Sequence, residues 1–485
     1  MSNHIPEKVK LKLLIYISLA LFIFIAFGGL FALRSLNTVK SVDESRTVYV
    51  ERTGAGYQLI RNGEPFFIQG AGGDSHFKEL AEIGGNTIRI FDTANLQYKL
   101  DEAHKYNLAV IVDIYLPRYN KTYNSYDDEN GNAILKQEIK ELVYQHKDHP
   151  ALLIWNLGNE INYPFVFRKN DFIKTFNELV SIIQAVDPNH PVSTSIEGVS
   201  RKAMSSIYIH SPEIDLLSFN TFGNTKLVNS NFAQISFLFG PKPYFFSELG
   251  PDGPWESSTT SWGAPIEATS SKKSELYSTR FNIIKDNEDA ASLGSLIFYW
   301  GTKLERTHTW FSLFKDGYKS EIINVIETLW NGPESSPELN RINYITVNTN
   351  DSRDNNRFFP GELSHSGITP QLIGLDYMLV NELGAHDNII FSPGELSHAE
   401  IIFHENYNDS VRIDWEIYPE AWYSDTKDMV VDNYKPIDSI VTIEKTKTTF
   451  FAPTKEGPYR IFAYVYNQDG FFATTNTPFY VLEKK

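Results

Sequence analysis

Short apolar runs alternate regularly with amphipathic stretches from residue 65 onward, and this alternation constrains the fold more than any other feature. Stretches with apolar residues three and four positions apart predict helices, among them residues 77–83, 96–106, 133–146, 171–185 and 273–285. The apolar runs predict eight strands, at residues 66–69, 87–91, 109–115, 152–156, 191–195, 216–220, 244–247 and 295–300. Eight such units predict an α/β fold, a (β/α)8 TIM barrel over residues 65–332. A doubly wound open sheet is the alternative, but no glycine-rich phosphate turn follows the first strand.

Segments on both sides of the predicted barrel differ from it in residue composition and in the pattern of apolar residues. Within residues 34–64 and just beyond, two apolar runs joined by Asn62-Gly63 predict a β-hairpin. Past the barrel, a stretch rich in Asn, Pro and Ser predicts a linker, and the alternating residues that follow predict an Ig-like β-sandwich at 333–485. Residues 344–366 and 377–399 share the sequence Pro-Gly-Glu-Leu-Ser-His, which we interpret as a duplicated strand-turn-strand segment.

Residues 13–33 contain no charged side chain, and as a helix they are long enough to cross a bilayer. Three lysines in residues 1–12 precede this run and fewer basic residues follow it, which predicts a cytoplasmic N-terminus and an exported remainder, periplasmic or extracellular. A cleaved signal peptide is the alternative, although its apolar region is usually about 7 to 15 residues long. We therefore expect a transmembrane signal anchor.

The composition excludes several classes of function. The 44 Lys and Arg against 60 Asp and Glu give a net charge of −16, which argues against a nucleic-acid partner. The chain has no cysteine, so it cannot use thiolate nucleophiles, zinc–thiolate sites or iron–sulfur clusters. Motifs of zinc peptidases, serine esterases and P-loop proteins are also missing from the sequence. We expect neither a cofactor nor a metal.

Two glutamates lie where predicted strands end. One apolar strand runs into Asn159-Glu160, and another runs into Ser247-Glu248. Catalytic side chains gather at the C-terminal ends of barrel strands. Cleavage of a glycosidic bond needs two carboxyl groups, one protonated toward the leaving oxygen and one ionised toward the anomeric carbon. Either glutamate alone could be a helix cap or a surface charge, but the pair predicts a glycosidase.

The segment Trp155-Asn156-Leu157-Gly158-Asn159-Glu160 at the fourth predicted strand, with Ser247-Glu248 at the seventh, resembles the catalytic barrel of clan A glycoside hydrolases, and the family 2 barrels most of all. The resemblance covers residues 65–330. It implies that Glu160 is the acid/base and Glu248 the nucleophile of a retaining mechanism. The sugar-binding sandwich that usually precedes the family 2 barrel has no counterpart between residue 33 and the first strand, which leaves the substrate open.

The resemblance implies roles for further residues of the barrel. Arg89 would hydrogen-bond the nucleophile, and a buried structural ion pair is the alternative for it. Asn159 would contact the sugar 2-hydroxyl, and Asn220 would lie in the substrate site. Phe222 stands where the clan often has a tyrosine that hydrogen-bonds the nucleophile, so that role is vacant or is taken by another residue, with Tyr299 and Tyr115 as candidates.

Loop residues after the predicted strands are expected at the rim of the cleft. Aromatic rings stack on the apolar faces of sugars, and polar groups bind their hydroxyls. Core packing is the alternative for any single aromatic residue. The candidates are Asp74, His76, Tyr115, Trp255, Trp300, Glu305 and Arg306.

Together these features predict a membrane-anchored, exported β-glycoside hydrolase or transglycosylase of the retaining type. Its expected substrate is a β-glucan or a related polysaccharide. The alternative is a catalytically inactive carbohydrate-binding or wall-organising protein that keeps the barrel as a scaffold. The presence of both glutamates argues against that alternative, whereas Phe222 in place of the tyrosine leaves it open.

Overall fold

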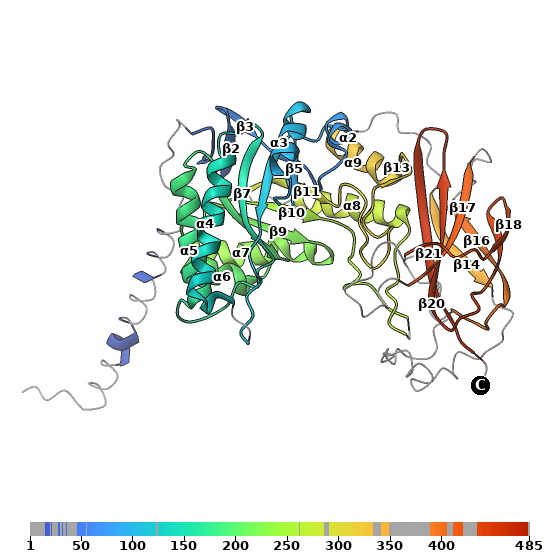
Figure 1. Ribbon diagram of the computed structural model, residues 1–485. Helices are drawn as coiled ribbons and strands as arrows, with labels where there is room; N and C mark the ends of the chain where they lie inside the picture. Colours follow the sequence, from blue (N-terminus) through green and yellow to red (C-terminus); the bar gives the residue numbers. More distant parts are fainter. Residues whose placement is uncertain are drawn as a thin grey trace, which may run out of the picture. The chain divides into compact units, whose positions relative to one another are not determined.

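Figure 1 shows the computed structural model of the chain. It describes residues 15–19, 21, 28, 29, 32, 35, 46–54, 56–122, 125–260, 262–285, 291–332, 341–348, 389–404, 411–420 and 434–483. Most of the expected anchor at 13–33 lies outside these ranges. Within them, no helix combines the length and the apolar character needed to cross a bilayer. The anchor therefore stays a prediction.

A closed barrel of eight strands confirms the predicted α/β barrel (Figure 1). Neighbouring strands from β5 to β9 pair in parallel, and their side chains are buried almost throughout. Counted around the barrel, β7 is the fourth strand and β10 the seventh. The strands are β4 (Ile68–Gly72), β5 (Thr87–Ile90), β6 (Ala109–Ile114), β7 (Leu152–Asn159), β8 (Val192–Glu197), β9 (Leu217–Thr221), β10 (Tyr244–Leu249) and β11 (Ser292–Phe298).

The start of the barrel differs from the prediction by two residues. Phe66 belongs to β3 (Glu64–Phe66), which pairs with β2 (Tyr57–Arg61) in the predicted hairpin, and β2 also pairs with β1 (Val48–Arg52). Asn62 and Gly63 turn the hairpin with φ angles of 54° and 80°, the left-handed conformations that an Asn-Gly turn supplies. The first barrel strand consequently begins at Ile68.

Helices follow most of the barrel strands, including the five predicted segments. α5 shows why they form: Asn170 caps its first turn by accepting from the Ile173 N–H, and Phe172, Phe176 and Ile183 pack inward at helical spacing. The helices are α2 (Phe77–Glu82), α3 (Leu96–Lys105), α4 (Glu129–His146), α5 (Asp171–Val186), α6 (Arg201–His210), α7 (Val228–Phe239), α8 (Ser270–Lys285) and α9 (Glu321–Asn331), with one-turn 3₁₀ segments η1 (Ser125–Asp127) and η2 (Gly223–Leu227).

Two compact units make up the chain. The first contains Met1–Ile68, Thr87–Ser247 and Asn287–Ser295, and thus strands β5 to β9 with helices α3 to α7. The second contains Gln69–Asn86, Glu248–Asp286 and Leu296–Lys485, and thus α2, α8, α9 and the C-terminal strands. The predicted domain boundary between residues 332 and 333 stays a prediction.

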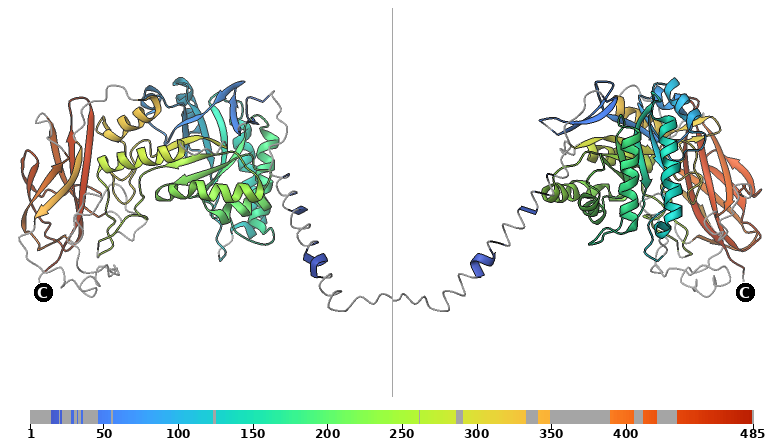
Figure 2. Two further views of the ribbon diagram at one scale, coloured as in Figure 1. Left: turned by 180° about the vertical axis from the view of Figure 1, so that it is seen from behind. Right: turned by 60° about the vertical axis from the view of Figure 1, so that its left-hand side comes forward.

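The C-terminal strands form two sheets that share one hydrophobic core, seen in orange and red in Figure 2. One sheet has the order β12-β13-β21-β20-β17 with β15 paired to β21, and the other has the order β14-β16-β19-β18. Ile345 and Ile401 of one sheet pack with Trp415, Ile461 and Phe479 of the other. This confirms a two-layer β arrangement, while its Ig-like character stays a prediction. The strands are β12 (Phe314–Lys315), β13 (Tyr318–Ser320), β14 (Ile342–Asn348), β15 (Ile389–Phe391), β16 (Leu396–Phe403), β17 (Arg412–Pro419), β18 (Ile440–Glu444), β19 (Lys447–Phe451), β20 (Gly457–Tyr466) and β21 (Phe471–Val481).

Part of the duplicated segment can be followed in these sheets. In the second copy, Pro393 and Gly394 turn the chain from β15 into β16, with Gly394 at a φ of 71°. Because β15 and β16 belong to different sheets, this turn carries the chain from one sheet to the other. The equivalent turn of the first copy, at Pro360, lies outside the part of the chain that is described.

Buried charges tie the C-terminal sheets to loops of the second unit. The Arg460 guanidinium donates to Glu420 Oε1 at 2.9 Å and to the Pro265 carbonyl at 2.6 Å. Nearby, Lys273 Nζ donates to Glu267 Oε1 at 2.5 Å and to the Thr309 carbonyl at 2.8 Å. In each ion pair the two opposite charges compensate each other at a position from which water is excluded. They hold the loops that follow β10 and β11 against the C-terminal strands.

Candidate active site

Glu160 follows directly after β7, the fourth barrel strand. The pairing of β7 with β8 is irregular between Asn156 and Asn159, and such bulges often re-aim a side chain beside an active site. The chain turns sharply there, because Glu160 has a φ of 50° and its N–H donates to the Ser195 carbonyl at 3.0 Å. A left-handed conformation at a residue other than glycine is uncommon and is retained where surrounding contacts enforce it.

Both carboxylate oxygens of Glu160 accept hydrogen bonds. Oε1 accepts from Asn220 Nδ2 at 3.0 Å, and Oε2 accepts from Arg118 Nη2 at 2.8 Å. Asn220 is buried, whereas the Arg118 side chain is 59% exposed. The Glu160 side chain itself is 20% exposed. One oxygen is thus fixed by a rigid partner, while the other is held by a side chain that faces solvent.

Arg89 is fully buried and forms a bidentate ion pair with Asp113. Its Nε lies 2.9 Å from Oδ1 and its Nη2 lies 2.7 Å from Oδ2 of that carboxylate. The same guanidinium donates to Asn159 Oδ1 at 2.9 Å and to the carbonyl of Ser247 at 3.1 Å. The structural ion pair that was the alternative for Arg89 is therefore present. In addition, Arg89 holds the residues that precede Glu160 and Glu248.

The two candidate asparagines have different hydrogen-bonding roles. Asn159 Oδ1 accepts from both Arg89 and Asn220, and within the described chain nothing accepts from its Nδ2 group, which leaves that group able to donate to a ligand. Asn220 donates to Asn159 and Glu160 and accepts from Ser247 Oγ at 2.8 Å. The protein itself uses the Asn220 amide to position its neighbours, and a contact of Asn220 with substrate stays a prediction.

Glu248 lies within β10, the seventh barrel strand. The predicted strand stopped at residue 247, but β10 continues to Leu249. Glu248 is 6% exposed, and its neighbours Ser247 and Leu249 are also buried. A carboxyl group kept from solvent in this way suits a site that reacts with a bound ligand. The expected separation of the Glu160 and Glu248 carboxyl groups stays a prediction.

Trp300 and His76 were expected at the rim; Trp300 packs inside the second unit, whereas the His76 side chain is 35% exposed. The Trp300 ring is fully buried and its Nε1 donates to the His76 carbonyl at 2.9 Å. The His76 ring stacks on Phe314 with 3.6 Å between centroids. Core packing, the alternative stated for each aromatic residue, is therefore correct for Trp300. Both side chains were placed at the rim because they follow strands, but a strand end does not reveal which loop covers it.

The remaining rim candidates reach solvent. Glu305 belongs to a tight turn, in which its N–H donates to the Thr307 carbonyl at 2.9 Å and Arg306 has a φ of 65°. Glu305 itself is half-buried, with Lys303 Nζ 3.5 Å from its carboxylate. The exposed candidates are Asp74, Tyr115, Trp255 and Arg306.

Three residues of the site were missed by sequence reasoning. Asp113 is the one charged residue in the apolar run of β6, so pairing it with the charge in β5 was possible from sequence. Asn156 donates to Asp113 Oδ1 at 2.8 Å and lies in the quoted strand-end motif. Arg118 sits in a loop, and no pattern in the sequence indicates its contact with Glu160.

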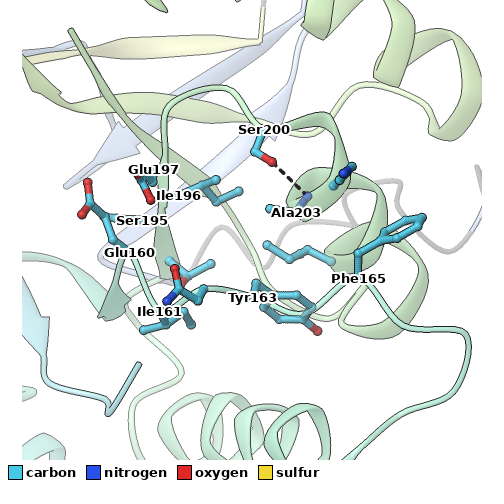
Figure 3. Close-up of a pocket in the computed structure, with 13 residues that line it drawn as sticks. Glu160, Ile161, Tyr163, Phe165, Ser195, Ile196, Glu197, Ser200 and Ala203 are labelled. Atoms are coloured by element: carbon cyan, nitrogen blue, oxygen red, sulfur yellow. Dashed lines mark hydrogen bonds between the residues drawn. The ribbon is translucent and has the colours of Figure 1, made fainter. Parts of the chain in front are cut away.

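A pocket of about 330 Å³ opens beside Glu160 and is drawn in Figure 3. Its walls come from the segment after β7, from β8 and from the start of α6. Figure 3 shows Glu160 and Phe165 at opposite ends of it. A concave site with aromatic and polar walls beside a strand-end carboxylate has the composition of a ligand site.

Comparison with known proteins relates the barrel to one family. A model described as "Glycosyl hydrolases family 2, TIM barrel domain" matches residues 86–236. Mannan endo-1,4-beta-mannosidase F of Aspergillus clavatus is 25% identical over 126 residues, which are 21% of this chain and 27% of that protein. Beta-glucuronidase of Paenibacillus borealis is 24% identical over 173 residues, which are 30% of this chain and 27% of that protein. The chain thus spans less than a third of the length of these relatives.

Among solved structures, the β-D-glucuronidase of Dictyoglomus thermophilum aligns with a TM-score of 0.47 and 18% identity, covering 61% of this chain and 55% of that one. The endo-β-1,4-mannanase of Thermotoga petrophila aligns with a TM-score of 0.38 and 13% identity, covering 87% of this chain and 99% of that one. The family match contains the Asn159-Glu160 motif on the fourth of the eight barrel strands. Over residues 86–236 the barrel is thus similar to the TIM-barrel domain of family 2 glycoside hydrolases, which agrees with the clan A resemblance.

Proposed function

We propose that this protein is a retaining β-glycoside hydrolase or transglycosylase. The observation that carries the proposal is the placement of Glu160 directly after the fourth barrel strand and of Glu248 on the seventh. Carboxyl groups at these two positions can serve as the acid/base and the nucleophile of a double displacement. The hydrogen bonds that hold Asn159, Glu160 and the Ser247 carbonyl support this proposal.

In the first step, the Glu248 carboxylate attacks the anomeric carbon while Glu160 gives its proton to the leaving oxygen. In the second step, Glu160 takes a proton from water or from a sugar hydroxyl, whose oxygen displaces Glu248. The free Nδ2 group of Asn159 would donate to the sugar 2-hydroxyl. Such a contact strengthens as the transition state forms. For Arg89, we propose that it keeps the site ordered through Asp113 and Asn159.

The substrate in this proposal is a β-glucan or a related polysaccharide. Relatives named as a mannosidase and a glucuronidase make β-mannosides and β-glucuronides further candidates. We also propose that residues 13–33 anchor the protein in a membrane with the barrel on the exported side, which the uncharged run and the lysines before it support. An exported barrel would meet polysaccharides of the cell surface.

The roles of the two glutamates can be tested with Glu160→Gln and Glu248→Gln on a panel of aryl β-glycosides with acidic phenols. Such leaving groups need little protonation, so the Glu160 variant should form the glycosyl-enzyme and then stall. Added azide should restore its turnover and give a β-glycosyl azide. The Glu248 variant should instead give the α-azide, because azide then attacks the anomeric carbon directly. Equal behaviour of both variants, or wild-type rates in both, would refute the assigned roles, and absence of turnover by wild type would support the inactive-scaffold alternative.

A further inference from the structure

Another pocket lies within the second unit, on the sheet that contains β13, β17 and β20 (Figure 1). Its volume is about 400 Å³, which is within the range of ligand sites. Its walls come from the β12–β13 turn, the start of β17, the end of β20 and the turn between β20 and β21. No described wall residue belongs to a barrel strand, so the pocket shares none with the strand ends that carry Glu160 and Glu248.

Two tyrosine rings and a guanidinium line this pocket. Arg412 lies over the Tyr466 ring, with 4.1 Å between its Cζ and the ring centroid, and over the Tyr318 ring at 5.6 Å. The two rings meet edge to face, with 4.7 Å between their centroids. These contacts hold the Arg412 side chain in place, although 55% of it is exposed. Because Tyr318 is half-buried, the pocket has both apolar ring surface and guanidinium N–H groups in its walls.

One wall residue has a buried polar group without a partner. Tyr466 is 2% exposed, and within the described part of the chain its hydroxyl forms no hydrogen bond. Burial raises the pKa of Tyr466, and the carboxylates of Asp414 and Asp316 raise it further, so the hydroxyl keeps its proton and can donate. A buried hydroxyl without a partner costs free energy, which a hydrogen bond to a ligand would recover. Asp316 lines the same pocket, so a ligand there would lie close to this hydroxyl.

The charges in and around the pocket are already paired. Arg412 Nη2 lies 3.2 Å from the Asp414 carboxylate, and Lys315 Nζ lies 3.5 Å from the Asp316 carboxylate. A charged ligand would bring a further charge next to two compensated pairs, and it would be repelled by Arg412 or by Asp316 according to its sign. The pocket therefore suits a neutral ligand.

The turn between β20 and β21 adds amide groups to the pocket. Asn467 Oδ1 accepts from the N–H groups of Asp469 at 3.1 Å and Phe471 at 2.8 Å, which leaves its Nδ2 group able to donate. Gln468 also lines the pocket and is exposed. Amide, guanidinium and phenol groups can donate to hydroxyl oxygens, and the Gln468 carbonyl can accept from a hydroxyl. Together with the ring surface of Tyr318, these groups match the hydroxyl edges and the apolar faces of a pyranose.

We propose that this pocket binds one or two sugar units of a neutral polysaccharide, and that the C-terminal sheets thereby hold the polymer at a place other than the active site. The choice of a sugar as ligand rests on the proposed function, whereas the site itself rests on the contacts described above. A polymer held at one place presents its other units at a raised effective concentration. The pocket thus increases the affinity of the protein for long chains and leaves its action on small glycosides unchanged.

The test measures retention of the full chain on insoluble curdlan, cellulose and β-mannan, with cross-linked polygalacturonate as the anionic comparison. All proteins carry Glu248→Gln, so that the polymer is not cleaved. Tyr466→Phe and Tyr318→Ala should each raise the protein concentration for half-saturation of a neutral polymer by about fivefold, because each removes one contact to the bound sugar. Phe451→Ala is the matched control, since Phe451 is 48% exposed on β19 of the other sheet and does not line the pocket.

Tyr466→Phe distinguishes binding from folding. It removes only a buried hydroxyl without a partner, so its denaturation midpoint should equal or exceed that of the parent protein. Weaker retention at an undiminished midpoint therefore reports a lost contact to the polymer. If Tyr466→Phe and Tyr318→Ala are retained like Phe451→Ala, the proposed sugar site is wrong. Absence of retention on every neutral polymer, or preferential retention on polygalacturonate, would also overturn it.

Kinetics with soluble aryl β-glycosides, measured with Glu248 intact, separate this inference from the proposed function. Turnover of these small substrates should change less than about twofold in Tyr466→Phe and Tyr318→Ala. If glycosides are turned over but the pocket variants bind polymer like the control, the sugar site fails and the proposed function stands. If no glycoside is turned over, yet both pocket variants weaken retention, the proposed function fails and the sugar site remains. Absence of both turnover and retention would overturn both.

Discussion

Replacing His308 with glutamine should make the folded protein less sensitive to acid. His308 lies in the loop after β11, with Nδ1 3.1 Å from the Tyr434 hydroxyl and Nε2 hydrogen-bonded to the Tyr464 hydroxyl. The rings of Tyr418 and Phe462 lie 4.8 and 4.5 Å from its own, measured between centroids. Burial among these rings lowers the pKa of His308 from 6.5 to about 4.

Nearby charges add smaller effects to this pKa. Lys315, Arg460 and Lys273 lower the pKa further, whereas Glu267 raises it. Because the folded pKa is below the unfolded pKa, the unfolded chain takes up the proton first as the pH falls. The stability that neutral His308 contributes is complete above pH 6.5 and is lost between pH 6.5 and 4. At about 1.4 kcal/mol for each pKa unit, the loss approaches about 3 kcal/mol.

The assay is denaturant unfolding of wild type and His308→Gln at pH 7.5 and 4.5, followed by tryptophan fluorescence. Other groups titrate in both proteins, so the informative quantity is the difference between their losses of unfolding free energy. We expect wild type to lose about 2 to 3 kcal/mol more than the variant. His104→Gln, which removes an exposed histidine of α3, is the control and should follow wild type. Equal losses in wild type and His308→Gln would refute the reasoning, since His308 would then titrate alike in both states.

Other perturbations test the remaining parts of the structure. Arg89→Met should lower the unfolding free energy by about 3 to 5 kcal/mol, because it leaves Asp113 buried without a counter-charge; a denaturation midpoint equal to wild type would contradict this. A crystal structure should place the Glu160 and Glu248 carboxyl groups about 5 to 5.5 Å apart, and a separation well beyond about 6.5 Å would exclude the retaining mechanism. Mass spectrometry of the protein from membranes should find residues 13–33 still attached, and a mature N-terminus near residue 35 would argue against the anchor.

Local patterns in the sequence were enough to predict the barrel and the two strand-end glutamates. Strands buried on both faces appear in the sequence as continuous apolar runs, and helices appear as apolar residues three and four positions apart. Both signals depend only on residues that are close together in the chain. The strand count that placed Glu160 on the fourth strand and Glu248 on the seventh agrees with the closed barrel. The Asn62-Gly63 turn was also predictable, because its left-handed backbone is a property of those two residues.

What the sequence by itself determined is therefore the order of the elements and the side chains at their ends, whereas tertiary structure decided what those side chains contact. Trp300 packs inside and Asn220 is used by its neighbours, although both stand at strand ends like the residues expected to bind substrate. Arg118 reaches Glu160 from a loop forty-two positions away in the sequence. Contacts of this kind form only when the barrel closes and brings distant strands and loops together. The spacing of residues along the chain therefore does not reveal them.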